Sequence, residues 1–255
     1  MFKKISLALA IGMSLIGYVN AEEAKVDNTK EISTQMTKFF GGDITNFVSE
    51  TNLPNAYLVN LKDGTNMIYF KDSNFAVVGD MYNLQTQKNV SRSLMSTYNE
   101  KVINEFANEG IKFPVTSTDK PVERVYVFTD PTCGYCRKLH HERDQYAANG
   151  IELVYLPYSR SGEDTFSYNE LVDVFCSKDK AHAMDLAKSD KGEEIKTLEG
   201  YAVNDSCKNE VAISQEGGRR LGISGTPALF TSDGHFFPGY VEASKLRAYI
   251  NEARK

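Results

Sequence analysis

The residues best suited to chemistry are two cysteines, Cys133 and Cys136, with Gly134 and Tyr135 between them. Thiols at this spacing close into a small disulfide ring, and so tight a ring is readily opened again by another thiol. The attacking species in that exchange is the thiolate, so the reactivity of each sulfur depends on its pKa. The spacing therefore predicts a pair that alternates between a disulfide and two thiols.

The same cysteines also make half of a potential zinc site, with His140 and His141 as further ligands. Neighbouring residues on a helix point about 100° apart, so only one of the two histidines can readily join the cysteines. We therefore expect no bound metal, and nothing in the sequence calls for a cofactor.

The sequence around the cysteines predicts a strand followed by a helix. The apolar run Val125–Phe128 is typical of a buried strand, and Pro131 cannot continue its hydrogen-bond ladder. Thr132 can cap the helix that we expect over Arg137–Ala148, and this places both cysteines in the first turn.

A helix start favours negative charge, because its N–H groups are unpaired and the macrodipole is positive there. A cysteine in that position can have its pKa lowered from about 8.5 to roughly 3.5–7.5. We assign the nucleophile to Cys133, nearer the helix start and the solvent, and the resolving thiol to Cys136. Arg137 and Lys138 can lower the pKa further, although such charges more often lie on a solvated helix face.

The N-terminus predicts export. Lys3 and Lys4 precede an apolar run over residues 5–17, and Val19–Ala21 supplies small residues before a cleavage point. This pattern is typical of a secretory signal peptide, here residues 1–21, cleaved after Ala21. The apolar run is too short to span a membrane, which takes about 20 apolar residues.

Two further cysteines, Cys176 and Cys207, fit an oxidising compartment. Four cysteines allow three pairings, and the closely spaced pair is expected to bond to itself. Cys176 and Cys207 then form a structural disulfide. The alternative, one metal ion bound by all four sulfurs, is improbable because the sequence has no second closely spaced pair of cysteines. The net charge of −5 without a Lys/Arg cluster argues against nucleic acid as a partner.

The segment after the signal peptide predicts a small α+β unit over residues 22–88. A helix is expected over residues 28–40, and Asp63–Gly64 joins strands 56–61 and 65–70 into a hairpin. A further strand is expected over residues 75–82. A unit of this size buries only a small hydrophobic core. We therefore expect the edge strand at residues 75–79 to pair with the same strand of a second copy. The alternative is that this edge strand is shielded by its own chain.

A linker is expected next, over residues 89–112. Residues 91–108 have the apolar spacing of an amphipathic helix, and residues 111–121 form an irregular stretch with two prolines. The remainder, 113–255, alternates strands and helices in the order β-α-β, a helical region over about 165–217, then β-β-α. Two strands joined by one helix make a right-handed unit with parallel strands.

This order, with paired cysteines at the first helix start, resembles a thioredoxin fold. More specifically, the chain resembles the periplasmic disulfide-bond isomerases of the DsbC/DsbG type. The stretches that carry this resemblance are Gly79–Tyr82, Phe128–Asp130, Cys133–Cys136, Lys138–His140, Phe175–Lys180, Leu221–Ala228 and Pro238–Tyr240. The implied fold class is an α+β N-terminal dimerisation domain, a linker helix and an α/β thioredoxin-fold catalytic domain with a helical insert. The stretch from Lys188 to Asn204 is longer than the resemblance leads us to expect.

The resemblance implies a V-shaped homodimer joined through the N-terminal domains, in the periplasm. It also implies misfolded, disulfide-containing exported proteins as substrates and a membrane thiol reductase of the DsbD type as electron donor. Pro227 is expected in the cis form beside the cysteines, and substrate contacts are expected from Thr226, Pro227, Gly134 and Tyr135. The main chain of Thr226 can pair with an extended substrate, because Pro227 has no N–H of its own.

A thioredoxin carries a buried acid seven residues before its first cysteine, and here that position is Tyr126. The base for Cys136 is therefore unassigned, with Asp130 as a weak candidate. The function that we expect is isomerisation or reduction of wrong disulfides through a mixed disulfide on Cys133, with chaperone activity. The alternatives are a dithiol oxidase and a holdase chaperone without a redox role.

Overall fold

The computed structural model describes residues 28–42, 45–62, 65–115, 119 and 121–254. The predicted signal peptide, residues 1–21, lies outside these residues. None of the helices in the described ranges is both long enough and apolar enough to cross a membrane.

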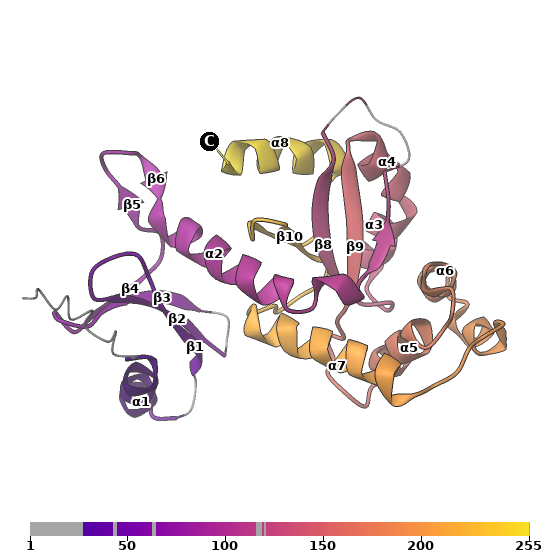
Figure 1. The fold of residues 1–255 in the computed structure, drawn as a ribbon, viewed down its shortest axis with the longest axis horizontal. Coiled ribbons are helices and arrows are strands. Elements are labelled where there is room, and N and C mark those ends of the chain that lie inside the picture. Colours follow the sequence, from indigo (N-terminus) through magenta and orange to yellow (C-terminus); the bar gives the residue numbers. More distant parts are fainter. Residues whose placement is uncertain (1–27, 43–44, 63–64, 116–118, 120, 255) are drawn as a thin grey trace, which may run out of the picture.

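The N-terminal part is a helix packed on an antiparallel sheet (Figure 1). Helix α1 (Thr29–Phe40) is followed by β1 (Thr45–Glu50), β2 (Ala56–Leu61), β3 (Asn66–Phe70) and β4 (Phe75–Val78), which pair in that order. The core between helix and sheet is formed by Ile32, Met36, Tyr57, Val59, Leu61, Met67 and Tyr69. The predicted helix is confirmed, and β2 and β3 pair antiparallel as predicted, while the predicted turn at Asp63–Gly64 lies outside the described residues. Strand β1 was not predicted.

The strand expected over residues 75–82 is shorter than predicted. It ends at Val78, because Gly79 takes a φ of +125° that turns the chain out of the sheet. Tyr82–Asn83 (β5) instead pairs with Lys88–Asn89 (β6) in a separate two-stranded ribbon.

The expected helix before the second sheet is α2 (Val90–Asn104), capped by the side chain of Asn89, which accepts a hydrogen bond from the N–H of Arg92. A short 3₁₀ helix, η1 (Ala107–Glu109), follows it. The expectation of an irregular stretch from residue 111 was wrong for its first residues. Ile111–Phe113 (β7) is an edge strand that pairs antiparallel with β9, so residues 111 and 112 belong to the second sheet and not to the linker.

The second sheet has the order β11-β10-β8-β9-β7. Strands β8 (Glu123–Thr129) and β9 (Ile151–Pro157) are parallel, as predicted, and the chain between them forms α3 (Gly134–His141) and α4 (Arg143–Ala148). Strands β10 (Ala228–Thr231) and β11 (Phe236–Pro238) are antiparallel to their neighbours, and α8 (Ala243–Ala253) completes the chain.

Helices cover both faces of this sheet. Along β8, Val125 and Val127 pack into one cluster with residues of α3–α6 and α8, while Tyr126 and Phe128 pack into another with residues of α2 and η1. This alternation is the period of two that a strand buried on both faces requires.

Four helical segments lie between β9 and β10: α5 (Phe166–Phe175), α6 (Lys180–Lys188), η2 (Gly192–Thr197) and α7 (Asp205–Arg220). A disulfide joins Cys176, at the end of α5, to Cys207, in the first turn of α7, as expected. The bond therefore ties the helical region to itself.

Candidate active site

The paired cysteines lie at the junction of β8 and α3. Cys133 is itself the N-cap of α3, and the prediction that Thr132 caps the helix was wrong. The N–H and the hydroxyl of Thr132 instead both donate to Oδ1 of Asp130, at 2.8 and 2.6 Å. The single helix expected up to Ala148 is interrupted at Glu142, where α3 ends and α4 begins.

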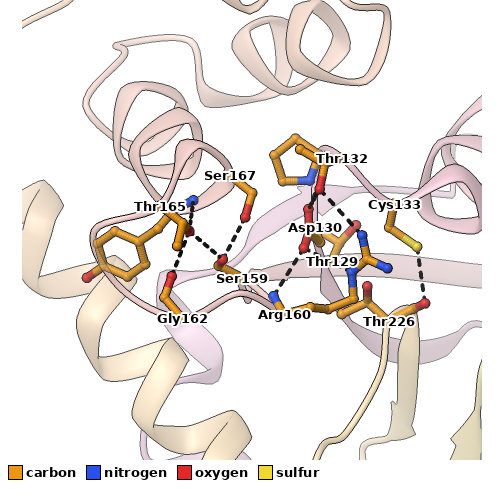
Figure 2. Close-up of polar contacts among 12 residues, drawn as sticks. Thr129, Asp130, Thr132, Cys133, Ser159, Arg160, Gly162, Thr165, Ser167 and Thr226 are labelled. Atoms are coloured by element: carbon orange, nitrogen blue, oxygen red, sulfur yellow. Dashed lines mark hydrogen bonds and ion pairs between the residues drawn. The ribbon is translucent and has the colours of Figure 1, made fainter.

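Both thiols are free and buried, with Cys133 4% and Cys136 1% exposed. When it is protonated, the thiol of Cys133 donates to the backbone carbonyl of Thr226, at 3.2 Å (Figure 2). The Thr226–Pro227 peptide bond is cis, as the family resemblance implied, and it leads directly into β10. The fold thus brings Thr226 and Pro227 to the cysteines across a long stretch of sequence.

The residues between the cysteines are more accessible. Tyr135 is 64% exposed and its ring stacks on that of Tyr240, with centroids 6.1 Å apart. Gly134 has open space around its Cα, since a Cβ placed there would meet no atom within 4 Å. These two residues therefore form an open surface beside Cys133.

The pKa values of the two thiols are shifted in opposite directions. A hydrogen bond from Cys136 lowers the pKa of Cys133 to about 5, against the opposing effect of burial, and the Thr226 side chain and the charge of Arg160 add to the lowering. Burial, followed by the hydrogen bond to Cys133, raises the pKa of Cys136 well above its ordinary value. Near neutral pH the pair therefore holds one proton on Cys136 and a thiolate on Cys133, which suits the roles assigned from the sequence.

Asp130 anchors the loop on the other side of Cys133. Its carboxylate accepts from the N–H and hydroxyl of Thr132 and from the N–H and Nε of Arg160, the last two at 3.1 Å (Figure 2). Burial raises the pKa of Asp130, but these hydrogen bonds outweigh burial and hold the pKa below its usual value. Because both oxygens are occupied, Asp130 is poorly placed to accept a proton from Cys136.

The cationic group beside Cys133 is Arg160, which sequence reasoning missed. Arg137 instead forms an ion pair with Asp190, at 2.6 Å, and the ammonium of Lys138 lies 4.4 Å from the ring centre of Tyr240. A sequence signal for Arg160 existed: it follows β9, and the carboxyl ends of two parallel strands meet at the same edge of a sheet.

The loop that carries Arg160 is held at several points. The N–H of Ser159 donates to the side-chain oxygen of Gln215 on α7, at 2.8 Å. The side-chain NH₂ of Gln215 donates in turn to the backbone carbonyl of Ser159, at 3.0 Å. The Ser159 hydroxyl lies 2.6 Å from that of Ser167 and 3.2 Å from that of Thr165 (Figure 2). The helical region therefore fixes the position of the arginine.

His140, which we weighed as a zinc ligand, is buried and engaged elsewhere. Its Nε2 lies 2.9 Å from Oδ1 of Asp185 and 2.7 Å from Nη1 of Arg143. Burial lowers the pKa of His140 to about 3. Among the residues that the structure describes, no three His, Cys, Asp or Glu side chains gather so as to hold a metal ion.

A second group missed from the sequence is Lys188, whose buried ammonium donates to Oγ1 of Thr129 and to the carbonyl of Asp130. Its sequence signal was weak: it follows the buried Met184 by four residues, and so lies on the apolar face of α6.

Relatives of known identity carry the name of a disulfide interchange protein. The chain is 38% identical over 131 residues to the thiol:disulfide interchange protein DsbC of Salmonella typhimurium, covering 51% of this chain and 52% of that protein. It is 26% identical over 256 residues to DsbC of Dickeya dadantii, covering 98% and 96% of the two chains. The chain thus spans about half the length of the relatives that it matches with the higher identity.

Among solved structures, the disulfide interchange protein of Neisseria gonorrhoeae is 23% identical over 58% of this chain and 97% of that one, with a TM-score of 0.46. Residues 115–254, more than half of the chain, match the family model of the thioredoxin-like domain. The parallel β8–α3–β9 unit, the antiparallel β10–β11 pair and α8 lie within that match. The chain therefore belongs to the family of thioredoxin-like domains, with relatives of the DsbC type.

Proposed function

We propose that this protein is a periplasmic thiol:disulfide interchange enzyme that acts as a protein disulfide isomerase and reductase. The observation that carries the proposal is the opposite ionisation of the two thiols, since the lowered pKa of Cys133 makes a thiolate at neutral pH while Cys136 stays protonated. A low pKa keeps Cys133 ionised, and therefore able to attack, at neutral pH, and it makes the Cys133 sulfur a good leaving group; an isomerase needs both.

In the first step, the Cys133 thiolate attacks one sulfur of a wrong disulfide in a substrate protein. A mixed disulfide forms, and the other substrate sulfur leaves as a thiolate. In the second step, either another substrate thiolate attacks the mixed disulfide and leaves a rearranged bond, or Cys136 attacks Cys133 and the substrate departs reduced. Only the second branch consumes the two electrons of the dithiol.

Substrate contacts are proposed at the open surface beside Cys133, from Gly134, Tyr135, Thr226 and Pro227. Support comes from the exposure of Tyr135 and from the position of the Thr226 carbonyl, 3.2 Å from the Cys133 sulfur. A main chain at this distance can pair with an extended substrate whatever its side chains, which fits a broad range of substrates.

We further propose a homodimer through the N-terminal domain, over residues 22–88, with residues 89–110 as the linker and the remainder as the catalytic domain. Strand β4 is a sheet edge whose four residues are exposed, with Phe75 and Val78 at 69% and 65%. An exposed apolar edge of this kind favours addition of a strand from a second copy. The family resemblance implies that the two catalytic domains of such a dimer face each other across a cleft, and the proposed chaperone activity is placed in that cleft.

The location and partners follow from the same proposal. Misfolded exported proteins supply the substrates, and a membrane thiol reductase of the DsbD type returns electrons to the oxidised pair. The DsbC names of the relatives and the signal-peptide pattern over residues 1–21 support a periplasmic site of action.

The test is refolding of a secreted protein whose disulfides have been scrambled. Wild type is expected to restore its activity, and Cys133→Ala to fail. Full rescue by Cys133→Ala, or none by wild type, would contradict the proposal. A dithiol oxidase would instead be found mostly oxidised when thiols are trapped in the native compartment, and a holdase would keep its full activity in the Cys133→Ala, Cys136→Ala variant.

A further inference from the structure

Lys188 is a buried lysine for which the steps above have no role. It is the last residue of α6 and is 1% exposed. Within the described part of the chain, no carboxylate forms an ion pair with its ammonium. Lysine is almost never fully buried unless it is paired, so its position here calls for an explanation.

The partners of Lys188 place it against the active site. Its Nζ donates to Oγ1 of Thr129 at 2.7 Å and to the carbonyl of Asp130 at 2.8 Å. Both residues lie at the end of β8, just before the loop that leads to Cys133. An ammonium has three N–H donors, so these two acceptors leave one for another group.

Of the charged groups that act on the Lys188 ammonium, Cys136 acts most strongly, so the two side chains lie near each other. The Cys136 thiolate would be stabilised by the charge of Lys188 and by a hydrogen bond from the main chain of Asp130, and the thiolate charge in turn favours the protonated form of Lys188. Both side chains thus meet at the main chain of Asp130, one from α3 and the other from α6.

The other charged and titratable groups that interact with Lys188 come from three elements. They are Asp130 from the loop after β8, Cys133, Arg137 and His140 at or on α3, and Glu170 on α5. Burial lowers the pKa of Lys188 to about 8, against the opposing charges of Cys136, Asp130 and Cys133. The amine therefore exchanges its proton close to neutral pH, as a proton acceptor must.

We propose that Lys188 takes the proton from Cys136 in the resolving step and then stabilises the resulting thiolate, a role that rests on the proposed disulfide exchange. The neutral amine removes the proton from the Cys136 thiol. The Cys136 sulfur then attacks Cys133, so that the Cys133–Cys136 bond forms as the bond from Cys133 to the substrate breaks. The substrate sulfur leaves with the electron pair and is protonated by water.

The reverse step follows the same route. When a donor thiolate reduces the Cys133–Cys136 disulfide by attack on Cys133, Cys136 leaves as a thiolate and the Lys188 ammonium returns the proton. The lysine thus has the function that remained unassigned when Tyr126 was found in place of a buried acid.

The experiment is a stopped-flow reaction of the reduced protein with one equivalent of a nitrobenzoate aryl disulfide, whose released thiolate is yellow. The first release reports attack by Cys133, and the second reports resolution by Cys136. Lys188→Met is compared with wild type from pH 5 to pH 10. Lys191→Met, at an exposed lysine on the adjacent turn, is the matched control.

For wild type we expect a second phase whose rate rises with a midpoint near pH 8. In Lys188→Met the first phase is expected to stay within about threefold of wild type. The second is expected to slow at least about tenfold at pH 7, with its midpoint moved up by about one unit or more. Lys191→Met is expected to match wild type in both phases.

A second phase in Lys188→Met within twofold of wild type and with the same midpoint would overturn the inference, as would a wild-type second phase that does not vary with pH. If circular dichroism shows that Lys188→Met is unfolded, Lys188→Arg serves instead, because arginine keeps the charge but cannot give up its proton. A wild-type rate and midpoint in that variant would equally overturn the proposal. Failure of the proposed function would appear separately, as a first phase no faster than that of an ordinary thiol.

Discussion

The strongest prediction concerns the hydrogen bond between the two active-site sulfurs. It is the largest influence on the pKa of Cys133: it outweighs burial, which raises the pKa, and it lowers the pKa more than Thr226 or Arg160 does. Replacing Cys136 by alanine removes the donor and keeps the rest of the site, whereas Cys136→Ser keeps an O–H donor at the same position.

The size of the effect follows from the energy of the bond. A hydrogen bond to a charged group contributes about 1.5–3 kcal/mol, and one pKa unit corresponds to about 1.4 kcal/mol. Loss of the bond is therefore expected to raise the Cys133 pKa from about 5 by roughly 1–2 units. The helix start, Thr226 and Arg160 remain in place, so the pKa in Cys136→Ala is expected to stay below that of an ordinary thiol.

The assay is the rate of alkylation by iodoacetamide between pH 3 and pH 10, confirmed by thiolate absorbance in the ultraviolet. The midpoint for Cys136→Ala is expected at roughly pH 6–7, and that for Cys136→Ser within about one unit of wild type. An unchanged midpoint in the alanine variant, or a wild-type midpoint near pH 9, would refute the assignment of the inter-sulfur bond as the main cause.

Four further outcomes are expected. Arg160→Met should raise the alkylation midpoint of Cys133, because its positive charge stabilises the thiolate, and an unchanged midpoint would count against that role. The Cys133 thiolate should stabilise the folded, reduced protein relative to Cys133→Ser, because its pKa is lower in the folded state than in the unfolded chain. This stabilisation should be complete above about pH 9 and lost as the pH falls through about 5. Thermal melts across pH check it, and a stability difference that grows toward acid pH would contradict it. Replacing both Cys176 and Cys207 by alanine should lower the free energy of unfolding by about 3–4 kcal/mol in urea titrations, because the bond closes a 31-residue separation, and a loss below about 1 kcal/mol would show that the bond constrains little. Val78→Lys should shift sedimentation toward a monomer, because it places a charge on an exposed sheet edge, whereas a dimer of unchanged stability would direct attention to another surface.

Much of the local structure could be predicted because its causes are local. The buried strand β8 and the antiparallel pairing of β2 with β3 each depend on residues close in sequence. The boundaries were less certain, as the end of β4 at Val78 and the short edge strand β7 show. Both errors arose where a few residues either pair with a neighbouring strand or do not, and that choice depends on a distant partner.

The fold of the site could be predicted, but its electrostatics could not. The cations nearest to the cysteines in sequence, Arg137 and Lys138, interact with other groups.

By itself, the sequence determined that two thiols sit at a strand-to-helix junction, because proximity along the chain is enough to place them there. Tertiary structure alone decided how each thiol ionises. Thr226 lies 93 residues beyond Cys133, Arg160 reaches Asp130 across 30 residues, and Lys188 reaches the same aspartate across 58. The physical reason is that a pKa depends on burial and on charges within a few ångströms, and only the folded chain brings groups so distant in sequence to that range.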